Sequence, residues 1–159
     1  MKTHPFVQRL YDLAARQDRG ALAELRRSLS NPLAALPYVA PFLARDARRQ
    51  EEATLVLIAG LFAMHPVRGQ MSLATALKRC AEKSDSVALR FRALLNADAE
   101  DLPTHLRHAV SLVRSQDLTI DYDDLFETIR WWGSHDRNRQ RAWARDFWGM
   151  TEATEETTT

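Results

Sequence analysis

Apolar residues recur along most of the chain at intervals of three and four positions, the spacing of one helical face. Phe6, Leu10 and Leu13 form such a face near the start. Alternating apolar and polar positions bounded by turn residues, the pattern typical of strands, are not found. The sequence therefore predicts an all-α fold without a β-sheet.

Capping residues and helix breakers divide this pattern into about eight helices with short connections. The expected helices span residues 5–14, 18–29, 46–63, 72–82, 85–96, 101–116, 121–132 and 135–148. The third is apolar on nearly all sides after Ala53, which predicts a place at the centre of the core. Three prolines between residues 31 and 41 predict only short turns there. Helices of this number and length favour a compact bundle.

The length of 159 residues is that of one domain. We expect residues 1–150 to form it, and the predicted loop at 65–70 marks a candidate boundary between two lobes. The segment 151–159 is polar, acidic and low in complexity, and it is expected to be a disordered tail.

Composition favours a cytoplasmic protein. Hydrophobic residues make up 45% and charged residues 27%, which are ordinary values for a soluble globular chain. The longest mostly apolar run, at 53–67, has about 15 residues and is too short to span a membrane. The first residues lack the apolar stretch of a secretion signal. The single cysteine, Cys80, excludes an internal disulfide, and we expect it to be a small buried residue.

Charge is distributed unevenly along the chain. Nineteen of the 22 basic residues are arginine, against 21 acidic residues. The planar guanidinium suits phosphate better than the ammonium of lysine does, although an arginine-rich genome would give the same excess. Residues 93–127 hold two bases and eight acids, whereas the segments on both sides are basic. We therefore expect two opposite surfaces, one basic and one acidic.

The sequence offers little to support an enzyme. His105 and His108 lie three positions apart on a predicted helix, a spacing that can hold a metal, but no third ligand has supporting spacing. The acids between 121 and 124 lack the glycine and distal glutamate of a calcium loop and are typical of a helix N-terminus. A phosphate-cradling glycine loop and a catalytic triad are also not found. We expect no catalytic residue, no metal and no cofactor.

Nucleic-acid binding is the class that the arginines favour. On the predicted helix 101–116, Arg107 and Arg114 lie away from the apolar stripe formed by Leu102, Leu106 and Val113. Further basic pairs recur at or near other helix ends, with few acids beside them. Such pairs can follow a phosphate backbone. The four tryptophans all lie between 131 and 148, and we interpret them as core or interface residues.

Several segments together resemble one known family. They are RGALAELRR at 19–27, VALRFRALL at 87–95, HLRH at 105–108, and the stretch from IDYDDL at 120–125 through Trp131-Trp132 to WARDFW at 143–148. In this order they are similar to the CasB family, the small subunit of the type I-E CRISPR surveillance complex Cascade. The resemblance covers about residues 6–148.

This resemblance implies an all-α, non-catalytic subunit with no cofactor that serves antiviral defence. It implies contacts with the Cascade backbone and large subunits and with a second copy of the chain, and no membrane. It also implies sequence-independent binding of single- and double-stranded DNA, which helps to stabilise the R-loop formed by the crRNA and its target.

The resemblance also implies which residues face nucleic acid. The basic residues that match the family's nucleic-acid face are Arg26, Arg27, Arg48, Arg90 and Arg107. Charge and helical position add Arg49, Arg92, His108, Arg114, Arg137 and Arg139. The acidic stretch 96–101 departs from the family pattern and argues against a continuous basic track across that loop.

Two other functions remain open at this point. In the first, the chain is a purely structural adaptor whose arginines form salt bridges with partner subunits. In the second, it is a metal-dependent hydrolase that uses His105 and His108. Binding of DNA that weakens with salt would separate nucleic-acid contact from the adaptor. Metal analysis with a nuclease assay would test the hydrolase.

Overall fold

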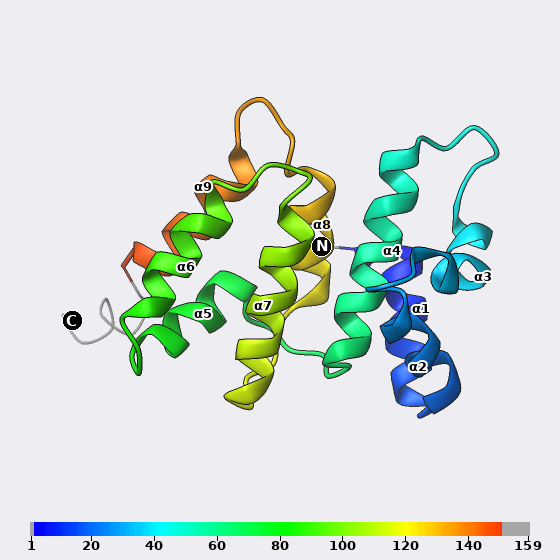
Figure 1. Cartoon of the computed structure of the whole chain (residues 1–159), viewed down its shortest axis with the longest axis horizontal. Coiled ribbons are helices and arrows are strands. Elements are labelled where there is room, and N and C mark those ends of the chain that lie inside the picture. Colours follow the sequence, from blue (N-terminus) through cyan, green and yellow to red (C-terminus); the bar gives the residue numbers. More distant parts are fainter. Residues whose placement is uncertain (1, 151–159) are drawn as a thin grey trace.

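The computed structural model describes residues 2–150, which form nine α-helices and two 3-10 turns (Figure 1). The elements are α1 (Pro5–Ala15), α2 (Arg19–Arg27), η1 (Pro32–Ala35), α3 (Leu36–Val39), η2 (Ala40–Phe42), α4 (Arg49–Met64), α5 (Leu73–Ala81), α6 (Ser86–Leu95), α7 (Leu102–Ser115), α8 (Tyr122–Arg130) and α9 (Asn138–Trp148). No strand occurs among these residues, so the predicted all-α class is confirmed. The helix beyond the expected eight is α3, a single turn within the proline-rich segment.

Three helices begin where the sequence places a capping side chain. The Asp18 carboxylate accepts a hydrogen bond from the Ala21 amide at 3.1 Å, and Ser72 Oγ accepts one from the Thr75 amide at 3.1 Å. Asp121 accepts from the Asp123 amide at 2.9 Å. Each cap satisfies an amide that the first helical turn leaves without a partner. These starts confirm the prediction for α2, α5 and α8.

The last helix begins later than predicted, at Asn138 rather than His135. The Asp136 carboxylate accepts hydrogen bonds from the Ser134 hydroxyl at 2.8 Å and the Asn138 amide at 3.1 Å. Arg137 adopts the left-handed conformation, with φ at 55°. Together these contacts keep residues 134–137 in a loop and delay the start of α9. The preceding helix also ends early, at Arg130 rather than Trp132.

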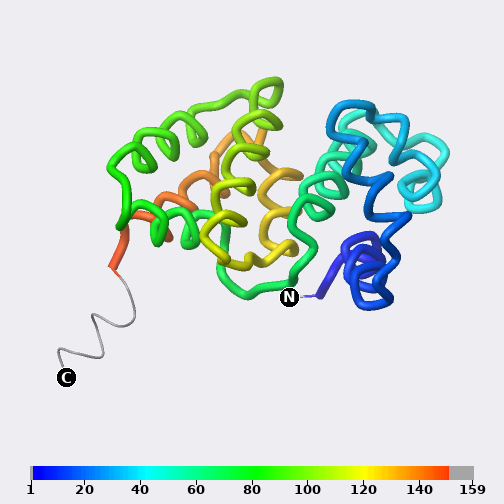
Figure 2. The backbone as a smooth tube through the Cα atoms, turned by 60° about the horizontal axis from the view of Figure 1, so that its bottom comes forward, coloured from blue at the N-terminus to red at the C-terminus, as the bar shows by residue number. Residues whose placement is uncertain are grey.

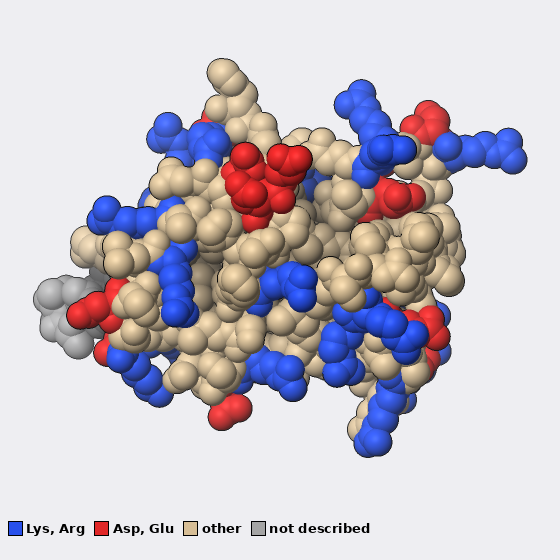
Figure 3. Space-filling view, in the orientation of Figure 1, with Lys and Arg blue, Asp and Glu red and all other residues tan. Residues whose placement is uncertain are grey.

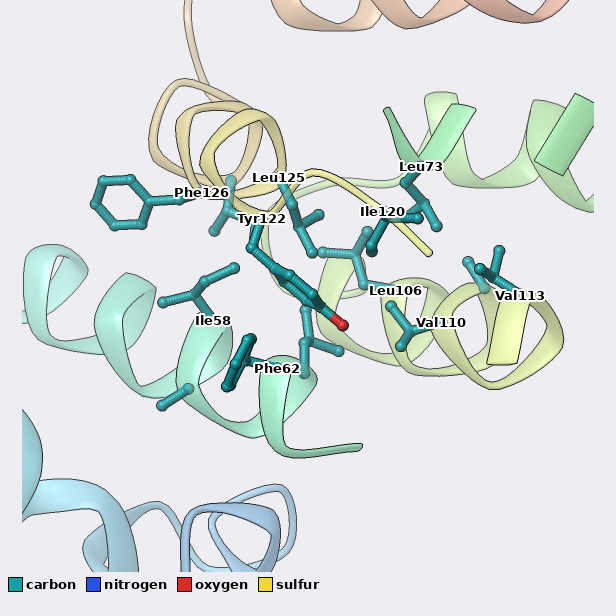
Figure 4. Close-up of a cluster of buried hydrophobic side chains, with 14 of the residues drawn as sticks. Ile58, Phe62, Leu73, Leu106, Val110, Val113, Ile120, Tyr122, Leu125 and Phe126 are labelled. Atoms are coloured by element: carbon teal, nitrogen blue, oxygen red, sulfur yellow. The ribbon is translucent and has the colours of Figure 1, made fainter. Parts of the chain in front are cut away.

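The helices form two groups that share one core. Figure 2 shows α1–α4 on one side and α5–α9 on the other, with the segment around 65–71 joining them. Figure 4 shows the Tyr122 ring between Ile58 and Phe62 of α4 and Leu106 and Val110 of α7. All five side chains are completely or almost completely buried in a single cluster. The core therefore crosses the candidate boundary at 65–70. The division into two lobes stays a prediction.

The segment 65–71 is tied to the segment 118–121 by backbone contacts. The Gly69 amide donates to the Ile120 carbonyl at 2.8 Å, and the Asp121 amide donates to the Met71 carbonyl at 2.8 Å. The His65 imidazole donates to the Leu118 carbonyl at 2.6 Å. A Cβ at Gly69 would lie 2.6 Å from the Ile120 nitrogen, so only glycine allows this approach. We call this pair of segments the backbone clasp.

The C-terminal helix carries much of the aromatic packing. Trp143 is fully buried, and its ring lies 6.0 Å from that of Trp132 in an edge-to-face arrangement. Phe147 stacks on Phe91 of α6 at 4.3 Å. These contacts confirm the predicted core role for Trp132 and Trp143. Cys80 is also buried as predicted, and burial raises the pKa of its thiol although Lys83 opposes the shift.

Two expectations concern the ends of the chain and the membrane. The predicted disordered tail at 151–159 lies outside the described residues. Among residues 2–150, no helix has both the length and the apolar character needed to cross a membrane.

Candidate nucleic-acid interface

Ten of the eleven predicted nucleic-acid-binding residues are exposed, and only Arg139 is half-buried. They lie at the C-terminal end of α2, at the start of α4, on the exposed sides of α6 and α7, and at the start of α9. On α7 the predicted division of faces is confirmed, because Leu102, Leu106 and Val113 are buried whereas Arg107 and Arg114 are exposed.

Most of these charges have no acidic partner within the part of the chain that the structure describes. In residues 2–150 three ion pairs form, Arg68–Asp123, Arg130–Glu127 and Arg139–Asp124. Only Arg139 belongs to the predicted set. The ten exposed residues are therefore neutralised by no described carboxylate at close range, and they are accessible to an external anion.

Arg139 is used inside the fold. Its guanidinium forms an ion pair with Asp124 of α8, and its Nε donates to the Thr128 hydroxyl at 3.1 Å. The second oxygen of Asp124 accepts from the Trp143 indole at 3.0 Å. These contacts join α9 to α8 and occupy the Arg139 guanidinium within the fold.

Two more predicted residues make contacts within the chain while remaining exposed. Arg137 Nη2 donates to the Leu95 carbonyl at 3.2 Å, and the Arg92 guanidinium lies 5.7 Å from the centre of the Trp148 ring. The first contact links the start of α9 to α6. The second is a cation–π pair at the surface, which adds little when exposed.

A groove between α6 and α7 brings Arg90 and His108 together. Its volume is about 630 Å³, and its wall also includes His105 and Ser111. None of its described lining residues is acidic. His105 and His108 thus face one groove, but no group of three metal-ligating side chains exists among the described residues.

Basic and acidic side chains share one face of the molecule, contrary to the expectation of two opposite surfaces. Figure 3 shows lysine and arginine side chains over α6, α7 and α2, with a cluster of acidic side chains above them, over the loop between α6 and α7. That loop carries the exposed residues Asp98, Glu100 and Asp101. The acidic residues of this loop share a face with the basic residues of α6 and α7 because the two helices pack side by side and the loop connects them at one end. The bases of the two helices meet across the groove, without crossing the acidic loop.

Comparison with known proteins identifies the family. The sequence model of the family described as CRISPR-associated protein Cse2 matches residues 21–148. The chain belongs to the Cse2 family. A curated CRISPR-associated protein Cse2 of Thermus thermophilus is 40% identical over 143 residues, which are 86% of this chain and 83% of the relative.

Solved structures of similar proteins agree with this assignment. The crystal structure of CasB from Thermus thermophilus is 37% identical, with a TM-score of 0.78, over 92% of this chain and 99% of that one. The resemblance to the CasB family read from the sequence is thereby confirmed. A chain of a CRISPR RNA-guided surveillance complex has a TM-score of 0.69 over 97% of this chain and 95% of that one. At 24% identity this second likeness concerns the fold alone.

This Cse2-family chain has a second cleft, between α4 and α8, with a volume of about 590 Å³. Arg48, Arg130 and Glu51 line it together with Trp131, whose side chain is half exposed. Of these, only Arg48 was predicted. Arg130 was missed because its spacing does not distinguish it, and Trp131 was interpreted with the other tryptophans as a core or interface residue. The only signal in the sequence is an aromatic residue beside a basic one at a helix end.

His4 lies at the edge of this cleft and caps α1. Its Nδ1 accepts a hydrogen bond from the Phe6 amide at 3.1 Å, and its ring lies 4.7 Å from that of Phe126. Burial lowers the pKa of the His4 imidazole, and the nearby Arg130 guanidinium lowers it further. The neutral ring is also the form that can accept the amide, since a protonated imidazole has no free lone pair.

The stability of the protein is expected to fall as His4 becomes protonated. Because the folded-state pKa lies below the ordinary value of 6.5, the unfolded chain takes up the proton first. This contribution is complete above pH 6.5 and is lost as the pH falls toward the folded-state pKa. In His4→Asn, which keeps a capping side chain that does not titrate, unfolding in urea should depend less on pH between about 7 and 5. Equal pH dependence in the two proteins would contradict this role.

Proposed function

We propose that this chain is the small subunit of a type I-E Cascade complex and binds nucleic acid without sequence specificity. In this role it contacts the backbone and large subunits and a second copy of itself, and it works in the cytoplasm. It stabilises the R-loop that the crRNA forms with its target, including the displaced strand. The chain contributes phosphate contacts and no catalytic step, while base pairing with the guide supplies the sequence specificity.

One observation carries the proposal: exposed arginines on α2, α6 and α7 have no described acidic partner in a member of the Cse2 family. Arginine binds phosphate oxygens with two parallel hydrogen bonds, and each neutralised phosphate releases counterions. These contacts do not read the bases. R-loop formation is a near-balanced exchange of one duplex for another, so a few such contacts can shift it.

The test is binding of the full chain to labelled single- and double-stranded DNA over a series of salt concentrations. Phosphate contact predicts that log K falls with log salt, by about 0.9 per contact on duplex and about 0.7 on single strands. Arg27→Ala/Arg107→Ala removes two charges from α2 and α7, so its slope on single strands should decrease by about 1.4.

The matched control is Arg45→Ala/Arg145→Ala. Both residues are exposed and form no described ion pair, but they lie before α4 and on α9. This control removes the same net charge and should keep most of the wild-type slope. An equal decrease in both double variants would show a diffuse charge effect and contradict a defined face.

The structural adaptor remains the second candidate, because large apolar side chains are exposed near the end of α9. Trp148 and Met150 are 48% and 79% exposed, and Leu89 of α6 is 70% exposed. Such residues suit contact with another protein surface. If the chain binds no DNA even at low salt, the adaptor replaces the nucleic-acid proposal, and the arginines face partner subunits.

A further inference from the structure

The groove between α6 and α7 combines a charged rim with an apolar floor. Leu77, Phe91 and Leu94 line it and are at most 3% exposed. Arg90 and His108 line it as well, and both are exposed. One nucleotide has the same two parts, because its base is flat and largely apolar on its faces whereas its phosphate is an anion.

The lining of the groove favours an anion as its occupant. Arg90 supplies a positive charge, His105 and His108 add imidazole groups that can donate hydrogen bonds, and the described lining contains no carboxylate. Arg107 and Arg114 lie on the adjacent exposed surface of α7. The volume of 630 Å³ falls within the range of roughly 300–1,000 Å³ that small-molecule sites occupy. The groove is therefore large enough for one base with its sugar.

We propose that this groove accepts one unstacked base of a single strand, while Arg90 and His108 contact the adjoining phosphates. This inference rests on the proposed function and names the strand state that the site selects. A duplex keeps its bases paired and stacked, so it presents only phosphates and leaves the apolar floor unused. A single strand can rotate a base into the groove and bury its faces there.

The site does not discriminate strongly between bases. Besides the Arg90 guanidinium, which is assigned to a phosphate, the polar groups of the lining are hydroxyls and imidazoles, namely those of Ser111, Ser115, His105 and His108. These groups both donate and accept hydrogen bonds, so they fit the edges of different bases. The amide and guanidinium pairs that read a single base do not converge on the floor, which is apolar.

The experiment compares two single strands that carry the same number of phosphates. The full chain is titrated with oligothymidine and with an abasic strand of equal length, and the salt slope is recorded for both. The wild type should bind oligothymidine more tightly, on the order of tenfold for each base accommodated. The salt slopes should agree, because the phosphate contacts are shared.

A variant that fills the groove should remove this preference. Leu112 is half-buried in the wall, and Leu112→Trp places a larger side chain there, which fills part of the groove. Its affinity for both strands should equal the affinity of the wild type for the abasic strand. Leu89→Trp is the matched control, since Leu89 lies on α6 but does not line the groove. If Leu112→Trp unfolds, Ala93→Phe narrows the groove from an exposed position on the opposite wall.

The possible results separate this inference from the function on which it rests. Equal affinity of the wild type for the two strands, or an unchanged preference in the groove-filling variant, would overturn the base site alone. Failure to bind either strand at low salt would overturn the proposed function as well. Preference for an apolar peptide over both strands would assign the groove to a protein partner and also overturn the inference.

Discussion

Tyr122→Ala is expected to lower the free energy of unfolding by about 3–5 kcal/mol, the range for deleting a large buried aromatic side chain. Tyr122 is fully buried and meets Phe62 edge to face at 4.9 Å (Figure 4). Its hydroxyl donates to the His65 carbonyl, and burial strongly raises the pKa of the phenol, so it stays a neutral donor. Alanine leaves a cavity where the two helix groups meet, and it also removes this hydrogen bond.

Tyr122→Phe separates the two contributions. It keeps the ring and leaves the His65 carbonyl without its partner, which costs about 1–3 kcal/mol for a buried group. Both variants are measured by urea unfolding of the full chain, with an unchanged dependence on denaturant as the check for a two-state transition. A loss below about 1 kcal/mol in Tyr122→Ala would mean that this junction contributes little to the fold.

Arg139→Ala is expected to cost about 2 kcal/mol of stability. Its guanidinium forms an ion pair with Asp124 and donates a hydrogen bond to the Thr128 hydroxyl. The side chains of Arg139 and Asp124 are only 23% and 25% exposed. Removing one partner of a buried pair costs about 3–5 kcal/mol, and the partial exposure of this pair reduces the loss. The change also frees α9 from one of its links to α8.

Arg145→Ala is the control for this position. Arg145 is an exposed arginine on the same helix that forms no described ion pair, and its removal should change stability by no more than about 0.5 kcal/mol. Urea unfolding gives the stability of both variants, and the DNA salt series is repeated where both are folded. An unchanged stability of Arg139→Ala with a reduced salt slope would instead support the nucleic-acid role that the sequence predicts for Arg139.

Helix starts were predictable where the capping side chain lies within three residues of the amide that it bonds. This holds for Asp18, Ser72 and Asp121, whose short side chains reach the first turn from the residue before it. The start of α9 was not predictable in the same way. It depends on the left-handed backbone at Arg137, and arginine has no preference for that conformation.

The exposure of the candidate interface residues was predictable from the sequence, but which of them lie together in space was not. Helical periodicity correctly separated Arg107 and Arg114 from the buried stripe of α7. The same reasoning could not show that Arg90 faces His108 across a groove, because this depends on how α6 packs on α7. Nor could it show that Arg139 is engaged by Asp124, a residue 15 positions away on another helix.

The backbone clasp and the core around Tyr122 have a consequence for synthesis on the ribosome. The Tyr122 hydroxyl bonds to a residue 57 positions earlier, and its ring lies against Ile58 and Phe62 of α4. While α1–α4 emerge, the residues that cover this face of α4 are still to be translated. The first half of the nascent chain is therefore expected to keep this apolar face of α4 exposed until α7 and α8 have been translated.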